Sequence, residues 1–227
     1  MSSQRFRTDP STLQSDRFEP ESGDFADEPA WNDHKIAFAL EHCAGLDVLD
    51  IGCVQHNPEN YRSRFWVHRA LREKAASLTG IDLSAPGVAF LKERGFNVVQ
   101  ADAQSFELDE DFDVIFAGDI IEHLEDLHGF LESCKRHLRV GGKLLISTPN
   151  PWYWRFVAQA MLRKEVNSNP EHTCWFDPRT FRQLLARHGM ILREVRYGSR
   201  YMRDRLLPLP RGIKHTSWHA VATMAPG

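Results

Sequence analysis

Carboxylic acids recur in the first half of the chain, each at the end of a short apolar run. Asp50, Asp82 and Asp102 close or follow three such runs, and Asp119 and Glu122 follow a fourth. A carboxylate can accept hydrogen bonds from both hydroxyls of a ribose. Several carboxylates in one cleft favour a cationic ligand and disfavour a pyrophosphate. These residues therefore predict a site for a positively charged nucleoside.

The acids can share a cleft only if the apolar runs are neighbouring strands. Segments with helical spacing of apolar residues separate the runs, and Ser84 and Asp177 are placed to cap two of the helices. The expected strands are 47–51, 78–81, 96–99, 112–116, 143–147, 190–195 and 218–223, and the expected helices are 31–43, 65–75, 84–95, 124–138 and 177–189. Gly141 and Gly142 are expected to end the fourth helix. This alternation predicts an α/β fold with helices on both faces of a parallel sheet.

Such a sheet binds its ligands outside the carboxyl ends of the strands, where the strand order reverses. The residues directly after each strand are therefore the first candidates for binding. Gly52 follows the first expected strand, and a glycine there lets the backbone approach a ligand closely.

The composition narrows the possible classes of function. Among 227 residues, 28 are Lys or Arg and 31 are Asp or Glu, which gives a net charge of −3. A nucleic-acid partner is not expected, because neutralising phosphates needs a cationic excess. No apolar run reaches the roughly 20 residues of a membrane span, and the first residues lack the apolar segment of a secretory signal. The four cysteines form no CxxC pair, so we expect a soluble protein of the reducing cytoplasm.

One domain is expected, preceded by an arm. Residues 1–28 are polar and acidic, which predicts a mobile N-terminal arm. Residues 29–227 are expected to form the domain, with 151–176 and 198–215 as insertions on the substrate side. The sequence makes no prediction of the oligomeric state.

Five motifs, in order from Trp31 onward, resemble those of class I S-adenosylmethionine-dependent methyltransferases. They are Val48–Cys53, Gly80–Leu83, Gln100–Ala103, Phe112–Leu124 and Leu138–Ser147. The triplet Glu122-His123-Leu124 and the later segment Glu171–Pro178 are similar to the branch that methylates small molecules. The resemblance implies a Rossmann-like, doubly wound, seven-stranded sheet, mostly parallel with an antiparallel last strand. It also implies a methyltransferase that uses S-adenosylmethionine (SAM) as its cofactor.

The resemblance further implies a role for each residue at the strand ends. The methionine part of SAM would be held by Asp50 and by the backbone of Gly52 and Cys53, with Ala117 and Gly118 on the side of the reactive methyl. The nucleoside would be held by Asp82 at the ribose hydroxyls, with Leu83 beside the adenine, and by Asp102 and Ala103 at the adenine amino group and ring edge. A structural alternative stays open for Asp82, which could merely start the helix that follows.

The first loop departs from the family pattern. Gly-x-Gly-x-Gly is usual there, whereas this chain has Gly52-Cys-Val-Gln-His56. The loop from Val54 to Asn60 must pass the cofactor by another route, and His56 or Asn57 either replaces a backbone contact or is a solvated loop residue. A second hypothesis therefore stays open, a methyltransferase-shaped binding or scaffold protein without activity. A nicotinamide-dependent dehydrogenase fits poorly, because this loop cannot easily face a pyrophosphate.

His123 and His172 are the candidate catalytic residues, since histidine is the usual base near neutral pH. The alternative for His123 is a core histidine paired with backbone. His172 and Cys174 are too few ligands for zinc, so no metal is expected. Trp152 and Trp175 are candidate substrate-binding residues, with plain packing as the alternative. The expected acceptor is a small molecule, a glycan or a lipid-linked compound, methylated on oxygen or nitrogen.

Overall fold

The computed structural model describes residues 29–55, 58–162, 165–166, 169–198, 201, 204 and 206–226. The arm expected over residues 1–28 lies outside the described residues, and so do His56 and Asn57 of the first loop. Within the described part of the chain, no helix combines the length and the apolar composition needed to cross a membrane.

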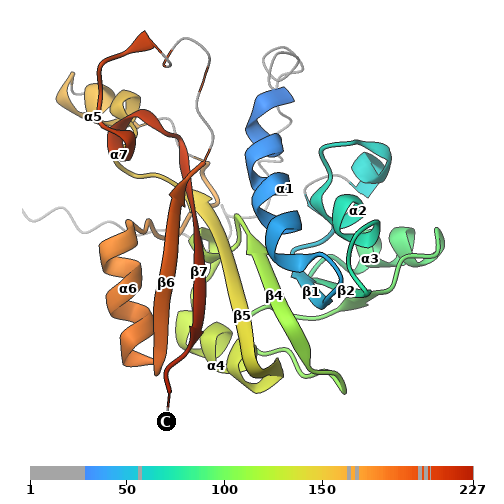
Figure 1. Ribbon diagram of the computed structural model, residues 1–227. Coiled ribbons are helices and arrows are strands. Elements are labelled where there is room, and N and C mark those ends of the chain that lie inside the picture. Colours follow the sequence, from blue (N-terminus) through green and yellow to red (C-terminus); the bar gives the residue numbers. More distant parts are fainter. Residues whose placement is uncertain are drawn as a thin grey trace, which may run out of the picture.

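The described residues form a seven-stranded sheet in the order β3-β2-β1-β4-β5-β7-β6 (Figure 1). Its strands are β1 (Asp47–Ile51), β2 (Ser77–Asp82), β3 (Val98–Gln100), β4 (Phe112–Gly118), β5 (Leu138–Pro149), β6 (Met190–Tyr197) and β7 (Ser217–Met224). The five strands from β3 to β5 pair in parallel, and β7 pairs antiparallel with both β5 and β6. The predicted Rossmann-like sheet, mostly parallel with an antiparallel last strand, is confirmed.

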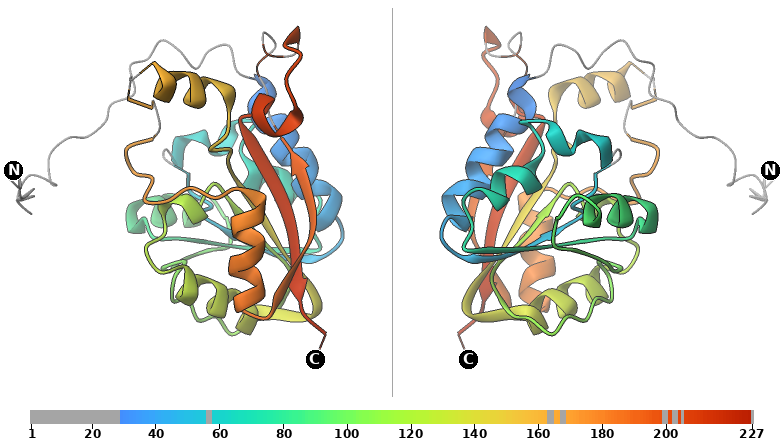
Figure 2. Two further views of the ribbon diagram at one scale, coloured as in Figure 1. Left: turned by 90° about the vertical axis from the view of Figure 1, so that its left-hand side faces the viewer. Right: turned by 90° about the vertical axis from the view of Figure 1, so that its right-hand side faces the viewer.

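Helices cover both faces of this sheet (Figure 2). They are α1 (Pro29–Cys43), α2 (Val67–Arg72), α3 (Ala85–Lys92), α4 (Leu127–His137), α5 (Trp154–Met161), α6 (Pro178–Arg187) and α7 (Arg211–Lys214), with short 3-10 helices η2 (Pro58–Arg62) and η3 (Ile121–His123). Successive side chains of a strand point to opposite faces. Val48 of β1 packs in one core with Phe38 of α1, whereas Leu49 packs in another with Phe130 of α4 and Phe181 of α6.

Both predicted helix caps are present. The Ser84 hydroxyl accepts from the Gly87 amide at 3.2 Å, and the Asp177 carboxylate accepts from the Arg179 and Thr180 amides at 2.7 and 3.1 Å. Such caps satisfy amides that have no partner inside the helix. The cap at Ser84 fixes the start of α3 only two residues after Asp82, so the helix and this acid are positioned together.

The predicted end of the fourth helix is wrong. The helix ends at His137, and Leu138 is already the first residue of β5, where it pairs with Phe112 of β4. Gly141 and Gly142, expected to end the helix, lie within this strand. An apolar residue at this position satisfies both the helical spacing and the start of a strand. Pairing with β4, which the local sequence does not contain, decides between them.

Other boundaries also differ from the prediction. β3 begins at Val98, because Phe96 packs its ring edge-on against Trp66 at 4.9 Å instead of entering the sheet. The helix expected over 65–75 is shorter, spanning Val67–Arg72. The aromatic segment after Pro151 contains a helix, α5, that the sequence analysis did not predict.

The carboxyl ends of β1, β2, β4 and β5 lie at one edge of the sheet, the upper edge in Figure 1. The strand order reverses between β1 and β4, since the chain builds outward from β1 to β3 and then returns to the other side of β1. Helices α5 and α7 lie beyond this edge (Figure 1). The residues that follow these strands are therefore the ones placed to bind a ligand.

Candidate active site

The predicted acids come from adjacent strand ends. β1 pairs with β2 so that Asp50 lies opposite Gly80, and β2 pairs with β3 so that Asp82 lies opposite Gln100. Asp102 follows Gln100 by two residues. On the other side of β1, Ile51 lies opposite Ala117 of β4. The parallel register therefore brings the predicted cofactor residues to one edge, as expected for a shared ligand site.

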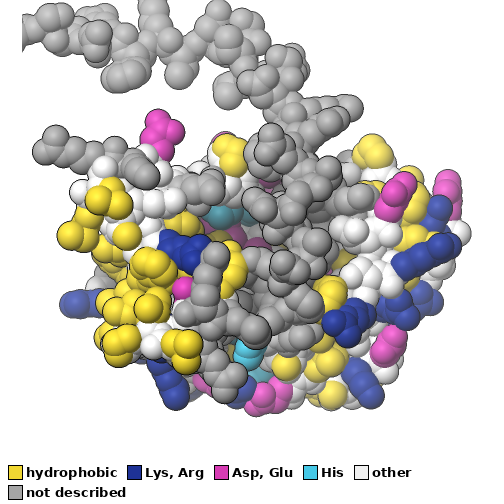
Figure 3. Space-filling view, turned by 90° about the horizontal axis from the view of Figure 1, so that it is seen from above, with side chains coloured by type: hydrophobic (Ala, Val, Ile, Leu, Met, Phe, Trp, Pro, Cys, Tyr) yellow, Lys and Arg dark blue, Asp and Glu magenta, His cyan; other side chains and the backbone are white. Residues whose placement is uncertain are grey.

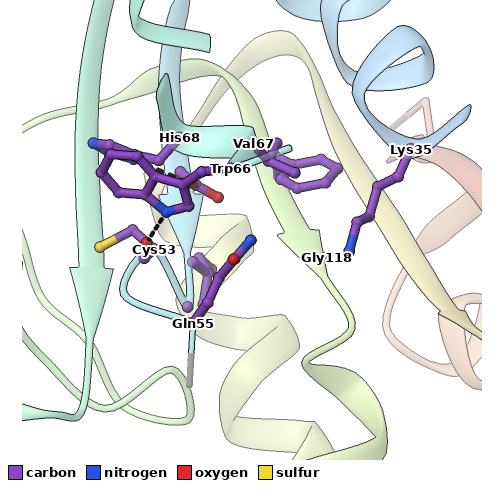
Figure 4. A pocket seen from close by; sticks show the side chains of 11 residues that line it. Lys35, Cys53, Gln55, Trp66, Val67, His68 and Gly118 are labelled. Carbon is purple, nitrogen blue, oxygen red and sulfur yellow. Dashed lines mark hydrogen bonds and ion pairs between the residues drawn. The ribbon is translucent and has the colours of Figure 1, made fainter. Parts of the chain in front are cut away.

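A hollow lies where β1 and β4 end (Figure 4). The residues around it include Lys35, Asp50, Gly52, Cys53, His68 and Gly118. Four of these were predicted from the sequence, whereas Lys35 and His68 were not. Asp82, Leu83, Asp102 and Ala103 are not among the lining residues, and they lie beyond the hollow on the side of β2 and β3.

Asp50 is buried in a pair with a histidine. Its Oδ2 lies 2.9 Å from Nδ1 of His68, and both side chains are almost fully enclosed. His68 belongs to α2 and also contacts the ring of Trp66 at 5.1 Å. The carboxylate of Asp50 is therefore held by the protein, with its position fixed before any ligand binds. The only signal for His68 in the sequence is its place on the apolar face of α2, three residues before Leu71.

The first loop is fixed by its own backbone bonds. The amides of Gly52 and Cys53 both donate to the carbonyl of Ile81, at 2.8 and 3.2 Å. These two N–H groups therefore already have partners within the protein. Gly52 has a φ of +79°, and a Cβ there would lie 2.2 Å from Ile120 Cδ1. Its glycine is required by both conformation and space.

A buried side chain occupies one of the two missing glycine positions of this loop. The pattern Gly-x-Gly-x-Gly starting at Gly52 has its second glycine at Val54, which is buried against α3. A Cβ at Gly87 of α3 would lie 2.4 Å from Val54 Cγ1, so the glycine of α3 leaves room for the Val54 side chain. Cys53, at a variable position of the pattern, is buried in the same core, and the Trp66 indole donates to its carbonyl at 2.8 Å.

Asp82 anchors this loop and the next helix at the same time. Its Oδ2 accepts from the Val54 amide and its Oδ1 from the Ser84 amide, both at 2.9 Å. Asp82 therefore has the structural role that the sequence left open, at the start of the helix that follows it. Each carboxylate oxygen can accept more than one hydrogen bond, so capacity for ribose hydroxyls remains. Leu83 beside it is 67% exposed, an apolar side chain standing in solvent where the adenine is expected.

The remaining predicted cofactor residues differ in their exposure. Asp102 is half-buried and accepts from the Gln104 amide at 2.9 Å, and Ala103 is half-buried against the core. Ala117 is fully buried in the core, so its side chain does not reach the hollow. Gly118 lines the hollow, and a Cβ there would lie 2.7 Å from the ring of Phe116.

A lysine from α1 forms an ion pair directly after β4. Lys35 Nζ lies 2.7 Å from Oδ2 of Asp119, and the Ser147 hydroxyl donates to Oδ1 at 2.9 Å. Asp119 has a φ of +56°, a conformation that its amide stabilises by donating to the Ser147 carbonyl at 2.8 Å. Burial raises the pKa of Asp119, but Lys35 and Ser147 outweigh it, so this pKa lies below its usual value. Lys35 lies on the apolar face of α1, three residues before Phe38.

Glu122 is a second acid beside this pair. It is 2% exposed, and its Oε2 accepts from the Thr148 hydroxyl at 2.9 Å. Its Oε1 has no hydrogen-bond partner among the described residues. Burial, together with the neighbouring charge of Asp119, raises the pKa of Glu122 to about 8. This carboxyl group therefore has one oxygen available inside a protected site.

The structure brings the two predicted catalytic histidines together. The rings of His123 and His172 meet edge to face, with centroids 4.8 Å apart. The chain after His172 is tied to the β4 end, since the amides of Thr173 and Cys174 donate to the Glu122 carbonyl at 2.8 and 3.3 Å. The ligand atoms of Glu122, His123 and His172 all lie within 4.8 Å of one another, so these three side chains could hold a metal ion.

The predicted substrate residues separate into two environments. Trp175 lies close to His172, with ring centroids 6.5 Å apart, and contacts Phe156 of α5 at 5.1 Å. Trp152 is 56% exposed, on the outer surface. The two predicted insertions are joined, because Tyr153 donates a short hydrogen bond to Asp204.

Comparison with known proteins assigns the chain to a family. A family model described as a methyltransferase domain matches residues 26–195, so the chain belongs to this methyltransferase family. A ubiquinone biosynthesis O-methyltransferase of Pseudomonas fluorescens is 29% identical over 128 residues, covering 53% of this chain and 49% of that protein. A probable S-adenosylmethionine-dependent methyltransferase of Mycolicibacterium smegmatis is 34% identical over 131 residues, covering 55% and 48%. The chain thus spans about half the length of these curated relatives.

Solved structures support the same fold. A SAM-dependent methyltransferase from Archaeoglobus fulgidus matches with a TM-score of 0.61 at 19% identity, covering 85% of this chain and 94% of that one. The N-methyltransferase NodS from Bradyrhizobium japonicum matches with a TM-score of 0.58 at 15% identity, covering 88% and 99%. Together with the family match, these findings show that the chain has the fold of SAM-dependent methyltransferases.

Proposed function

We propose that this protein transfers the methyl group of SAM to a hydroxyl oxygen of a small molecule with an apolar part. The observation that carries the proposal is the cluster of Glu122, His123 and His172, which we call the acceptor cluster. Glu122 and His123 follow Gly118 by four and five residues, at the end of β4 that borders the hollow, and His172 joins them from a distant segment. A buried carboxyl group and two imidazoles suit the binding and deprotonation of a hydroxyl.

The residues around the hollow fit the cofactor. The methionine part of SAM carries a carboxylate and an ammonium group, and the hollow offers the Lys35 ammonium to the first and the Asp50 carboxylate and Gly52 carbonyl to the second. The ribose hydroxyls are assigned to Asp82, and the adenine to the exposed Leu83 with Ala103 and Asp102. Gly118 allows the closest approach from β4, because no side chain stands there.

SAM when bound supplies a methyl group already activated by a positively charged sulfur. The task left to the protein is to place the acceptor oxygen in line with that methyl and to exclude water. As the new carbon–oxygen bond forms and the carbon–sulfur bond breaks, an imidazole of the acceptor cluster, that of His123 or His172, accepts the hydroxyl proton. Trp175 packs beside His172 and in turn contacts Phe156, so aromatic side chains adjoin the acceptor cluster.

The surface beside the cluster favours an acceptor with an apolar or lipid-like part over a glycan. Large apolar side chains are exposed on and near α5 and α7, and Figure 3 shows hydrophobic side chains gathered on that side of the upper face. They are Trp152, Val157, Met161, Leu162, Leu206 and Ile213. A monomer surface seldom exposes so many without a binding role. The likeness to ubiquinone biosynthesis O-methyltransferases supports the same acceptor class.

The expected compartment is still the cytoplasm. All four cysteines are free thiols, three of them buried. Thiols persist where the surroundings are reducing.

Mass spectrometry of reaction products tests the proposal. The protein is incubated with a metabolite and lipid extract and with SAM labelled in its methyl group, and labelled products are identified. We expect an O-methylated product, and we expect His123→Gln and His172→Gln to bind SAM normally while losing most of the transfer. The exposed histidine of α4 gives a matched control, since His128→Gln should transfer at the wild-type rate. Full transfer by both cluster variants would contradict the proposal.

A further inference from the structure

We infer that the acceptor cluster is a divalent-cation site and that the cation binds the acceptor oxygen. The inference rests on the proposed function, which it deepens by naming how the hydroxyl is held. The three side chains offer one carboxylate oxygen and two imidazole nitrogens, within 4.8 Å of one another. Three protein ligands of this kind, with further positions left open, are typical of catalytic zinc and related transition-metal sites.

The buried oxygen of Glu122 is the second, independent observation. Oε1 is buried and has no hydrogen-bond partner in the described part of the chain, and Glu122 is only 2% exposed. Leaving a buried acceptor unsatisfied costs about 1–3 kcal/mol, so such an atom calls for an explanation. A cation at the centre of the cluster would satisfy it.

The segment that supplies His172 is held in place by backbone bonds. The Thr173 amide donates to the Glu122 carbonyl at 2.8 Å, and the Thr173 hydroxyl donates to the Leu124 carbonyl at 3.0 Å. Because of these bonds, His172 cannot move far from Glu122. Tetrahedral zinc places its ligand atoms about 3.4 Å apart. Closing the cluster therefore requires side-chain movements of about 1 Å, within the range of rotamer adjustment.

In the inferred cation site, the partners of His172 are Glu122 and His123, whereas the sequence analysis weighed Cys174 as its partner. Cys174 was weighed as the second ligand, but its Sγ donates to the Ile121 carbonyl at 3.4 Å. The partners come instead from the end of β4, in a segment far away in the sequence. Only the packing of the two segments shows this combination.

A bound cation would change how the hydroxyl loses its proton. The two imidazoles would hold the cation and would not act as bases themselves. Coordination lowers the pKa of a hydroxyl, so the O–H bond can break with the proton passing to solvent before the methyl arrives. The resulting oxygen attacks the methyl carbon as the carbon–sulfur bond breaks. The ligand class is therefore a divalent transition-metal ion together with a hydroxylated acceptor.

Cobalt titration of the full chain, without any polyhistidine tag, tests the inference. A second group on the surface, His128, Glu132 and His188, could also hold an ion. All measurements are therefore made with His128→Gln as the background variant. We expect one equivalent of Co²⁺ to give a visible d–d absorption band, which Zn²⁺ displaces. Glu122→Gln and His172→Gln in the same background should weaken Co²⁺ binding by 10-fold or more, with unchanged circular dichroism.

The outcomes separate this inference from the proposed function. If Co²⁺ does not bind at millimolar concentration, or binds equally to the background and to both cluster variants, the inference is overturned. Loss of methyl transfer in the same variants would then leave the proposed function standing with a histidine base. If the ion binds at the cluster but a strong chelator leaves O-methylation unchanged, the assigned role of the cation is overturned. Cation binding together with loss of O-methylation on chelation supports the inference.

Discussion

The ion pair of Lys35 with Asp119 links the stability of the fold to the cofactor site. We expect Lys35→Met to lower both the free energy of unfolding and the affinity for SAM. The Lys35 side chain is 10% exposed and that of Asp119 is 33% exposed, with 2.7 Å between Nζ and Oδ2. Two unit charges at this separation attract by about 6 kcal/mol at an effective dielectric constant of 20, most of which desolvation offsets. Because Asp119 retains contact with water, we expect a net loss of about 2 kcal/mol, below that of a fully buried pair.

A matched pair on the surface provides the control. Lys135 and Glu132 are 2.8 Å apart, but they lie three residues apart on one helix, and replacing Lys135 leaves the contact of Glu132 with His188 in place. Lys135→Met should cost less than about 0.5 kcal/mol and leave SAM binding unchanged. Urea denaturation measures the stabilities, and isothermal titration calorimetry measures the SAM affinities. For a chain of this size, a loss of 2 kcal/mol lowers the melting temperature by about 4–8 °C.

The double variant shows whether the cost comes from the acid left behind. Lys35→Met alone leaves the Asp119 carboxylate in a half-enclosed site without its cation. Replacing both residues, with Asp119→Asn as the second change, should recover part of the stability. It should not recover the affinity for SAM, because the lysine that faces the hollow is still absent. If Lys35→Met is no more destabilising than Lys135→Met and binds SAM as wild type does, the reasoning is refuted.

Two further perturbations test other parts of the site. Asp82→Ala should weaken SAM binding by 10-fold or more in calorimetry, because it removes the proposed ribose acceptor and the anchor of the Val54 amide. Equal SAM affinities of the variant and the wild type would contradict the assignment of the ribose to Asp82. Burial lowers the pKa of His219 to about 4, with Asp119 opposing, against 6.5 for an unperturbed histidine. Between pH 6.5 and 4 the unfolded chain therefore binds a proton that the folded protein does not, and stability is lost as the pH falls, by up to about 3 kcal/mol. His219→Phe should flatten this slope in urea titrations at several pH values, and parallel curves for the two proteins would show that another group is responsible.

The sequence predicted the strand ends well because parallel strands impose their own geometry. Asp50, Asp82 and Asp102 lie at one edge of the sheet, since each closes or follows a strand that runs in the same direction as its neighbours. The caps at Ser84 and Asp177 are likewise encoded locally, whereas the antiparallel last strand was expected from the family resemblance. The predicted boundaries were wrong where a local pattern fitted both a helix and a strand. Leu138, for example, fits the helical spacing but is the first residue of β5.

The glycine-poor loop shows why a motif can look incomplete in the sequence. Val54 stands at a position where glycine is usual, and the space that its side chain needs is provided by Gly87 of α3. The loop sequence alone shows only that two of the usual glycines are missing. How Val54 is accommodated becomes visible only when α3 is packed against the loop.

The amino-acid order by itself determined the class of fold and the edge of the sheet along which the acids lie, because the alternation of strands and helices and the hydrophobic period are properties of neighbouring residues. Tertiary packing alone decided that Lys35 faces Asp119, that His68 holds Asp50 and that His172 meets Glu122 and His123. These partners lie on separate elements, and no spacing in the chain encodes the distance between them. Burial and the neighbouring charges then set their chemistry, since removal of water and the charge of Asp119 together raise the pKa of Glu122.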